Sequence, residues 1–219
     1  MLTSQESIDP NDQRRKIFVP ISVGNRFYTR ARMQAILDRL SIDSAELLIL
    51  ICDRLRYFAY RGRNAMDKET AAIKARKESD ELRSMIEKVA HHNVIRYRID
   101  MYSDHDGNSR FRQLKACVQS IVEDNEDVYQ ECLRISDYYL ARFYEAPDER
   151  ARKWQCTNTI GAATISLYCT ECLGFNEEYY KDADGMLIQH LYAHHPDLLK
   201  AALQKATLER KFTALLGSI

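Results

Sequence analysis

The stretch FVPISVGNRFYTRARMQAIL, residues 18–37, passes from a short apolar run into an amphipathic pattern. Residues 16–22 (KIFVPIS) are rich in β-branched and aromatic side chains and predict a strand, in which Pro20 indicates an edge or the end of a ladder. Thr29 is a suitable N-cap for the helix that follows. The apolar residues of that helix recur at helical spacing: Met33, Ile36, Leu37 and Leu40.

The turn between this strand and helix has two interpretations. Ser22, Gly24 and Asn25 are residue types that commonly close turns. Ser22 would also stand at the carboxyl end of a strand, where a serine can act as a nucleophile. Local sequence alone leaves both interpretations open.

The rest of the chain continues the alternation of strands and helices. A continuous apolar strand is predicted at 46–52, a long helix at about 67–90 and an alternating strand at 94–103. This order predicts a doubly wound α/β fold with a mainly parallel sheet, which binds ligands beyond the carboxyl ends of its strands. Further helices are predicted at 110–123, 126–144, 150–173 and 196–214.

Composition indicates one domain over 16–219 behind a flexible lead at 1–15. The 219 residues include 32 basic and 32 acidic side chains, so a basic field over the whole molecule is excluded. The polar N-terminus does not resemble a signal peptide, and the longest apolar run is too short to span a bilayer. With reduced cysteines, we expect a cytoplasmic protein without membrane contact.

Several catalytic motifs are missing from the sequence. It contains no P-loop, no G-x-G-x-x-G after the first strand and no G-x-S-x-G around Ser22. Cys169 and Cys172 form a C-x-x-C motif that, with Cys156 and the histidines at 190, 194 and 195, is compatible with zinc. The motif lies in an apolar helical pattern without a defined fourth ligand, so we expect core cysteines and no metal.

A series of motifs points to one known family. They are an Ile-Ser-x-Gly-Asn turn at 21–25, an aromatic pair at 27–28, an apolar strand that ends before Asp53, a long charged helix, the segment 171–175 and Tyr192. In this order they resemble the tRNA-dependent cyclodipeptide synthases, over about residues 17–205.

The resemblance implies a Rossmann-like fold related to the catalytic domain of class I tyrosyl- and tryptophanyl-tRNA synthetases. It implies an aminoacyltransferase that joins two aminoacyl-tRNAs into a 2,5-diketopiperazine, and we expect a monomer. The aminoacyl ester is already activated, so no cofactor and no ATP are needed. This agrees with the absence of a P-loop and of the synthetases' His-Ile-Gly-His and Lys-Met-Ser-Lys-Ser motifs.

The resemblance also assigns roles to residues. Ser22 would carry the first aminoacyl group and then the dipeptide as an ester. Backbone N–H groups around Val23, Gly24 and Asn25 would stabilise the oxyanion. Glu171 would hold the α-ammonium group, and Tyr192 would assist proton transfer during cyclisation.

Two positions depart from the family pattern. The family usually has a tyrosine four residues before its glutamate, where this chain has Leu167, with Tyr168 one residue later. Because one residue turns a helix by about 100°, Tyr168 need not take the same place. Ala193 follows the final tyrosine, where common branches have His or Pro, which suggests an outlying branch such as the fungal arginine-containing synthases.

An arginine substrate would require a carboxylate in its pocket, and the predicted helix 126–144 and its end offer Asp137 and Glu145. Phe18, Pro20 and a residue of the second strand, Ile49 or Ile51, are expected to form other pocket walls. Side-chain size at these positions does not identify the two amino acids.

For tRNA binding, the sequence offers a predicted loop at 54–63 and the helix at 67–88. The loop combines four arginines with Tyr57, Phe58 and Tyr60, which suits single-stranded RNA, unless the tyrosines pack in the core. The helix holds six basic and six acidic residues, so a tRNA-binding stripe and a solvated face with ion pairs are equally compatible. The candidate tRNA ligands are Arg54, Arg56, Arg61, Arg63, Lys74, Arg76, Lys77 and Arg83.

Two other functions remain compatible with the sequence. One is an aminoacyl-tRNA-dependent transferase that forms an amide with a different acceptor. The other is a non-catalytic tRNA-binding module that keeps the fold.

Overall fold

A computed structural model describes residues 15–62, 64–91, 96–141, 144–177 and 203–205. Its sheet has the order β3-β2-β1-β4, and every described pair of neighbouring strands is parallel. The prediction of a doubly wound, parallel α/β fold is therefore confirmed. The strands are β1 (Arg15–Ile21), β2 (Ser44–Ile51), β3 (Tyr97–Met101) and β4 (Asn176–Glu177).

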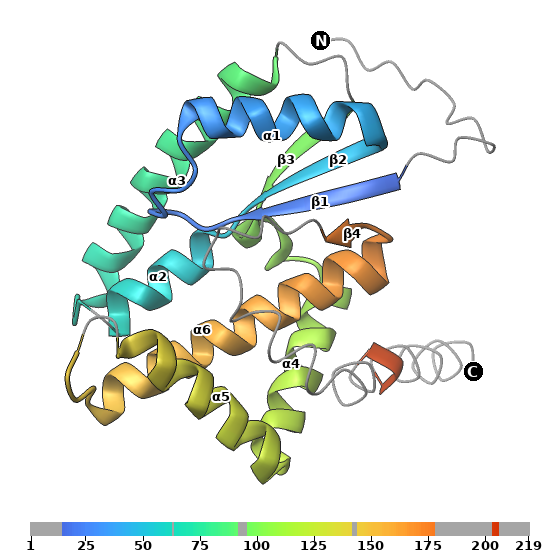
Figure 1. The fold of residues 1–219 in the computed structure, drawn as a ribbon. Helices are drawn as coiled ribbons and strands as arrows, with labels where there is room; N and C mark the ends of the chain where they lie inside the picture. The colour runs from blue at the N-terminus through green and yellow to red at the C-terminus, as the bar shows by residue number, and fades with distance from the viewer. Residues whose placement is uncertain (1–14, 63, 92–95, 142–143, 178–202, 206–219) are drawn as a thin grey trace.

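Helices cover both faces of this sheet. Helices α1 and α3 lie on one face, and α4, α5 and α6 lie on the other (Figure 1). The helices are α1 (Arg30–Asp43), α2 (Asp53–Gly62), α3 (Lys68–Ala90), α4 (Ser109–Asp124), α5 (Glu126–Leu140) and α6 (Glu149–Leu167), with a 3₁₀ turn at Tyr102–His105 and a π-helical segment at Tyr168–Cys172.

Strand β2 shows why the sheet requires cover on both sides. Leu47, Ile49 and Ile51 pack with α1 and α3, whereas Leu48 and Leu50 belong to the cluster formed with α4, α5 and α6. All five side chains are fully buried. Successive side chains of a strand point to opposite faces, so a continuous apolar run must be covered twice, as the sequence predicted.

The prediction of a loop at 54–63 is wrong, because residues 53–62 form helix α2. Leu55, Phe58, Ala59 and Gly62 recur at helical spacing, a pattern obscured in the sequence by the intervening arginines and tyrosines. This face packs against α6 so closely that a methyl group on Gly62 would lie 2.8 Å from Cβ of Trp154. Tertiary packing thus decides the conformation of this segment.

Other boundaries differ in detail. The predicted helix 150–173 is α-helical only to Leu167 and then continues as the π-helical segment. Strand β4 was not predicted; it pairs with Ile17 and Phe18, before Pro20. Of the helix predicted at 196–214, only residues 203–205 are described, and they are helical. The predicted lead at 1–15 lies outside the described residues except for its last residue, which begins β1.

Candidate active site

The segment that follows β1 is a tight turn. The backbone N–H of Asn25 donates to the carbonyl oxygen of Ser22 at 3.2 Å, and Gly24 has a φ of 79°. A positive φ at the third position is the requirement of a type II turn, which glycine meets without strain. The turn exposes Ser22 and buries Val23.

A second set of hydrogen bonds fixes the path from this turn into α1. The side-chain oxygen of Asn25 accepts from the N–H of Phe27 at 2.9 Å, and the Tyr28 hydroxyl donates to the Pro20 carbonyl at 3.1 Å. Thr29 caps α1, because its Oγ1 accepts from the N–H of Arg32 at 3.4 Å and its carbonyl accepts from the N–H of Met33 at 2.9 Å. The predicted N-cap is confirmed, and Asn25 acts within the turn.

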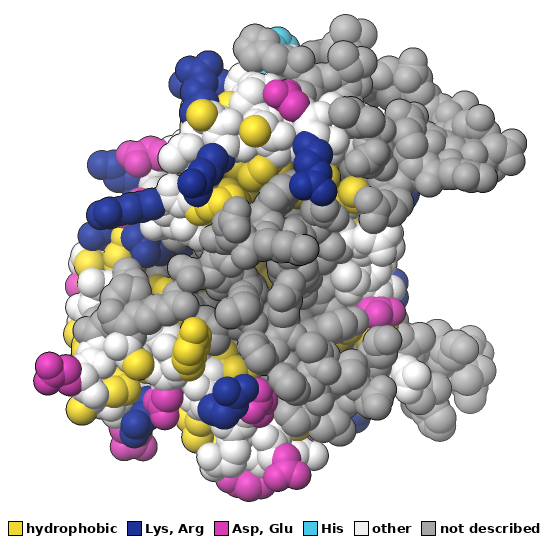
Figure 2. Space-filling view, in the orientation of Figure 1, with side chains coloured by type: hydrophobic (Ala, Val, Ile, Leu, Met, Phe, Trp, Pro, Cys, Tyr) yellow, Lys and Arg dark blue, Asp and Glu magenta, His cyan; other side chains and the backbone are white. Residues whose placement is uncertain are grey.

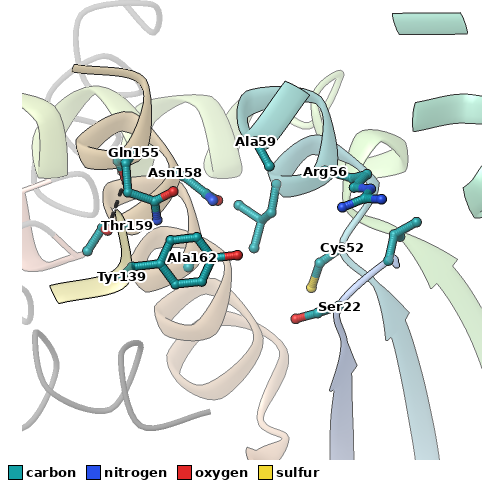
Figure 3. A pocket seen from close by; sticks show the side chains of 11 residues that line it. Ser22, Cys52, Arg56, Ala59, Tyr139, Gln155, Asn158, Thr159 and Ala162 are labelled. Carbon is teal, nitrogen blue, oxygen red and sulfur yellow. Dashed lines mark hydrogen bonds between the residues drawn. The ribbon is translucent and has the colours of Figure 1, made fainter. Parts of the chain in front are cut away.

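Ser22 opens onto a cavity of about 120 Å³ at the carboxyl ends of β1 and β2, called here the Ser22 pocket. Figure 3 shows Ser22, Cys52 and Arg56 on one side and Gln155, Asn158 and Tyr139 across the pocket. A doubly wound sheet is expected to bind ligands at this position. The lining residues are Ser22, Val23, Cys52, Leu55, Arg56, Ala59, Tyr139, Gln155, Asn158, Thr159 and Ala162.

The α6 wall of this pocket was missed by sequence reasoning. Gln155, Asn158, Thr159 and Ala162 lie at positions i, i+3, i+4 and i+7, which form one face of a helix. Three neighbouring hydrogen-bonding side chains on a largely buried helix are unusual, because burying a polar group without a partner is costly. That polar stripe was the available sequence signal.

Arg56 enters the pocket from α2 and is anchored to α3. Its Nε donates to Oε2 of Glu78 at 2.7 Å, and the Tyr60 hydroxyl donates to Oε1 of the same carboxylate at 2.5 Å. The guanidinium also lies 4.5 Å from the centre of the Tyr60 ring. We call these three residues the Arg56 clamp.

The charges of the clamp are mutually stabilised. Burial alone lowers the pKa of Arg56, but its hydrogen bond to Glu78 and the charge of that carboxylate raise the pKa overall. Burial alone raises the pKa of Glu78, but the hydrogen bonds from Arg56 and Tyr60 lower it overall. Both side chains are therefore charged at neutral pH.

The other predicted catalytic and substrate-binding residues lie outside the described lining of the Ser22 pocket. Phe18 and Leu167 are fully buried in the core, and Pro20 is half-buried in β1. Tyr168 is buried, with its ring 5.2 Å from that of Phe111. Glu171 is exposed in the π-helical segment. The last predicted catalytic residue, at position 192, lies outside the described residues.

The two carboxylates proposed for an arginine pocket are also placed elsewhere. Asp137 accepts from Nε of Arg152 at 2.8 Å on the surface, and Glu145 is exposed. Neither lines the Ser22 pocket, whose described lining includes no acidic residue. The described residues therefore give no support to the arginine-specific interpretation.

Most candidate tRNA ligands make local contacts. Arg54 pairs with Asp106, and Arg61 donates to the carbonyl of Met66, while Arg63 lies outside the described residues. On α3, two intrahelical ion pairs join Arg76 to Asp80 at 3.1 Å and Arg83 to Glu87 at 3.0 Å. These contacts match the ion-paired alternative considered from the sequence.

Two lysines of α3 remain open to solvent. Lys74 and Lys77 are exposed, and Nζ of Lys74 lies 4.9 Å from the ring centre of Tyr60. Figure 2 shows basic side chains gathered on the part of the surface formed by α1 and α3. A local concentration of basic side chains of this kind is what a polyanion would need.

The aromatic residues of α2 differ in burial, because Tyr57 and Phe58 are only half-buried. Tyr60 is buried, and Phe58 stacks on Trp154 with ring centres 6.0 Å apart. The ring of Tyr57 meets Trp154 edge-on at 6.4 Å. Tyr60 therefore packs in the core, as the sequence alternative has it, whereas Tyr57 and Phe58 keep exposed area and line a surface cavity beside Arg54.

Within the described ranges, no group of three or more His, Cys, Asp or Glu side chains is arranged to hold a metal ion. Cys169 is fully buried and Cys172 is half-buried, while the three histidines considered with them lie outside those ranges. The described helices also include none with the length and apolarity needed to cross a membrane.

Comparisons with known proteins agree with this architecture. A family model described as cyclodipeptide synthase matches residues 2–160, whereas a search of curated proteins gives no match. A solved cyclodipeptide synthase from Fluoribacter dumoffii has a TM-score of 0.70 at 20% identity and covers 82% of this chain and 84% of its own. One from Staphylococcus haemolyticus has a TM-score of 0.70 at 13% identity, with 84% of each chain covered.

A third structure, from Mycobacterium tuberculosis, is described as demonstrating that cyclodipeptide synthetases are related to type I tRNA-synthetases. It has a TM-score of 0.64 at 17% identity and covers 73% of this chain and 69% of its own. At these identities the solved structures establish the shared fold.

Proposed function

The chain belongs to the cyclodipeptide synthase family, and on that basis we propose that it joins two aminoacyl-tRNAs into a cyclic dipeptide through Ser22. One observation carries the assignment of Ser22. This serine is exposed on a tight turn at the carboxyl end of β1 and lines a pocket there. A serine nucleophile needs both features, because its Oγ must reach a carbonyl carbon held in the pocket.

The first step exchanges one ester for another. Ser22 Oγ attacks the carbonyl carbon of an aminoacyl-tRNA, and the bond to the terminal ribose oxygen breaks. The serine proton passes to that oxygen, which leaves as the tRNA hydroxyl. An ester replaces an ester, so the reaction needs no additional activation.

The backbone donors available to the oxyanion of this step are limited by the turn. The N–H of Asn25 already donates to the carbonyl of Ser22, so it closes the turn. The N–H groups of Val23 and Gly24 remain as the nearest backbone candidates, and they would stabilise the negative charge that develops on the carbonyl oxygen.

Two further acyl transfers complete the proposed cycle. The amino group of the Ser22-bound residue attacks the carbonyl of a second aminoacyl-tRNA, forms a peptide bond and releases the tRNA. The new terminal amino group then attacks the Ser22 ester, closes the ring and returns the proton to Oγ. In this scheme Glu171 holds the α-ammonium group and Tyr192 assists proton transfer, as the family resemblance implies.

Expression in bacteria followed by mass spectrometry of small molecules tests the proposal. We expect a diketopiperazine from the wild type and none from Ser22→Ala. Ser120→Ala, which changes a serine bonded to Asp124 on the surface of α4, is the matched control and should keep full activity. A diketopiperazine from Ser22→Ala would refute the assignment.

The same experiment, together with a tRNA-binding measurement on the purified protein, separates the alternatives. A linear amide that depends on charged tRNA would indicate a different acceptor. Binding of tRNA without any new small molecule would indicate a non-catalytic module.

A further inference from the structure

Arg56 lies directly against the turn that carries Ser22. A methyl group built on Gly24 would stand 2.5 Å from Cζ of Arg56, and 2.6 and 2.9 Å from its two terminal nitrogens. Such distances are far below van der Waals contact, so the guanidinium rests on the bare Cα of this glycine. Residue 24 must therefore be glycine for two reasons, its positive φ and the position of Arg56.

Contacts on the side away from Gly24 hold the guanidinium in this position. The Nε group is engaged by Glu78 of α3, whose other oxygen is fixed by Tyr60. The Arg56 and Glu78 side chains are only 16% and 28% exposed. A planar guanidinium with one edge bound in this way has little rotational freedom, so its terminal nitrogens stay on the Gly24 side.

We propose that Arg56 is a positioning residue for Ser22. The Arg56 clamp connects α2 and α3 to the turn and holds the turn in the conformation in which Ser22 faces the pocket. This inference rests on the proposed acyl transfer to Ser22.

The inference replaces the role of a phosphate ligand that the sequence suggested for Arg56. A side chain that is 16% exposed and paired with a carboxylate presents little charge to a tRNA backbone. Its terminal nitrogens face Gly24 and the Ser22 pocket. Phosphate contacts affect tRNA affinity, whereas a positioning residue affects the rate of the chemical step.

Single-turnover kinetics separate these two roles. The protein is mixed with increasing concentrations of one aminoacyl-tRNA, and the aminoacyl-enzyme is quantified by intact-mass measurement. For Arg56→Ala we expect the maximal rate to fall about 100-fold while the tRNA concentration for half-maximal rate stays within about twofold. Arg56→Lys should remain slow, because an ammonium group keeps the charge but cannot reproduce the planar fork.

Arg134→Ala is the matched control, because it removes an arginine–glutamate pair with Glu131 on the exposed surface of α5. Its maximal rate should equal that of the wild type. A normal maximal rate with weakened tRNA binding in Arg56→Ala would overturn the inference and restore the phosphate role. If the wild type forms no aminoacyl-enzyme, the proposed function fails, and the positioning role fails with it.

If Arg56→Ala does not fold, Tyr60→Phe tests the same inference. It removes one hydrogen bond to Glu78 and keeps the ring beneath the guanidinium. We expect a maximal rate about 10-fold lower at unchanged tRNA affinity, in protein whose melting temperature shows that it is folded. A wild-type rate in folded Tyr60→Phe would overturn the inference.

Discussion

Gly24 shows how much of the site depends on one atom. The missing Cβ allows the left-handed conformation of the turn and also makes room for Arg56. The turn was predictable from the sequence, since Ser, Gly and Asn favour turns. The second requirement was not, because Arg56 is distant in sequence and reaches Gly24 only through the packing of α2.

A Gly24→Ala substitution should impair both stability and activity. The left-handed conformation costs an alanine about 1–2 kcal/mol, and the new methyl group displaces the Arg56 guanidinium. We expect a lower free energy of unfolding in denaturant titrations and cyclodipeptide yields at least about 10-fold lower. Gly107→Ala is the control, because a methyl group there meets no atom within 4 Å. Equal behaviour of the two variants would contradict the account.

At the scale of elements, α2 is where sequence reasoning failed most clearly. Its arginines and aromatic rings resemble an RNA-binding loop, but its apolar face is complementary to α6. Asp53 adds a further constraint, since its carboxylate accepts from the N–H of Ser103 at 3.0 Å and ties the start of α2 to the 3₁₀ turn that follows β3. Local composition does not reveal such partners.

The close packing of α2 on α6 predicts the sign of a stability change. Replacing glycine by alanine in a helix usually stabilises a protein by up to about 1 kcal/mol. At Gly62 the methyl group would lie 2.8 Å from Cβ of Trp154, so we expect Gly62→Ala to destabilise the protein by about 1–3 kcal/mol. Chemical denaturation measures this change, and a stabilised variant would show that the two helices are not in such close contact.

The change of helix type after α6 affects the expected position of Tyr168 relative to Glu171, the residue proposed to hold the α-ammonium group. The sequence argument that Tyr168 need not take the place of Leu167 assumes a turn of about 100° per residue, as in an α-helix. The structure becomes π-helical at residue 168. Hydrogen bonds then skip one more residue, and side chains shift relative to an α-helix. Such a local change could not be deduced from residue spacing.

At the scale of the whole molecule, the basic and acidic residues balance, so the proposed tRNA substrate would need a locally basic surface. Arg76 and Arg83 of α3 are neutralised within the helix, whereas Lys74 and Lys77 are exposed. Long-range attraction to a polyanion depends on uncompensated charge near the surface. The α3 surface is therefore the expected place of tRNA contact.

The double charge reversal Lys74→Glu and Lys77→Glu should weaken tRNA binding and reduce its salt dependence. Each lost phosphate contact lowers the slope of log K against log salt by about 0.7–0.9. Binding titrations at several salt concentrations measure this slope, with Lys153→Glu on α6 as the control. An unchanged slope would place the tRNA on another surface.

The overall architecture was more predictable than the composition of the site. The continuous apolar run of β2 and the periodic apolar faces of long amphipathic helices are strong signals, which gave the order of elements and the place of Ser22. The Ser22 pocket combines residues from the β1 turn, α2, α5 and α6. Their meeting depends on three-dimensional packing, so the place of Arg56 in the pocket and the α6 wall emerged only from the structure.

The central claim, that Ser22 carries the aminoacyl group, is tested most directly by intact-mass measurement of the protein after mixing with one aminoacyl-tRNA. We predict a mass increase equal to one aminoacyl group, located by peptide mapping at Ser22 and absent from Ser22→Ala. An unmodified wild-type protein that still releases a cyclic dipeptide, or a label on any other residue, would contradict the account.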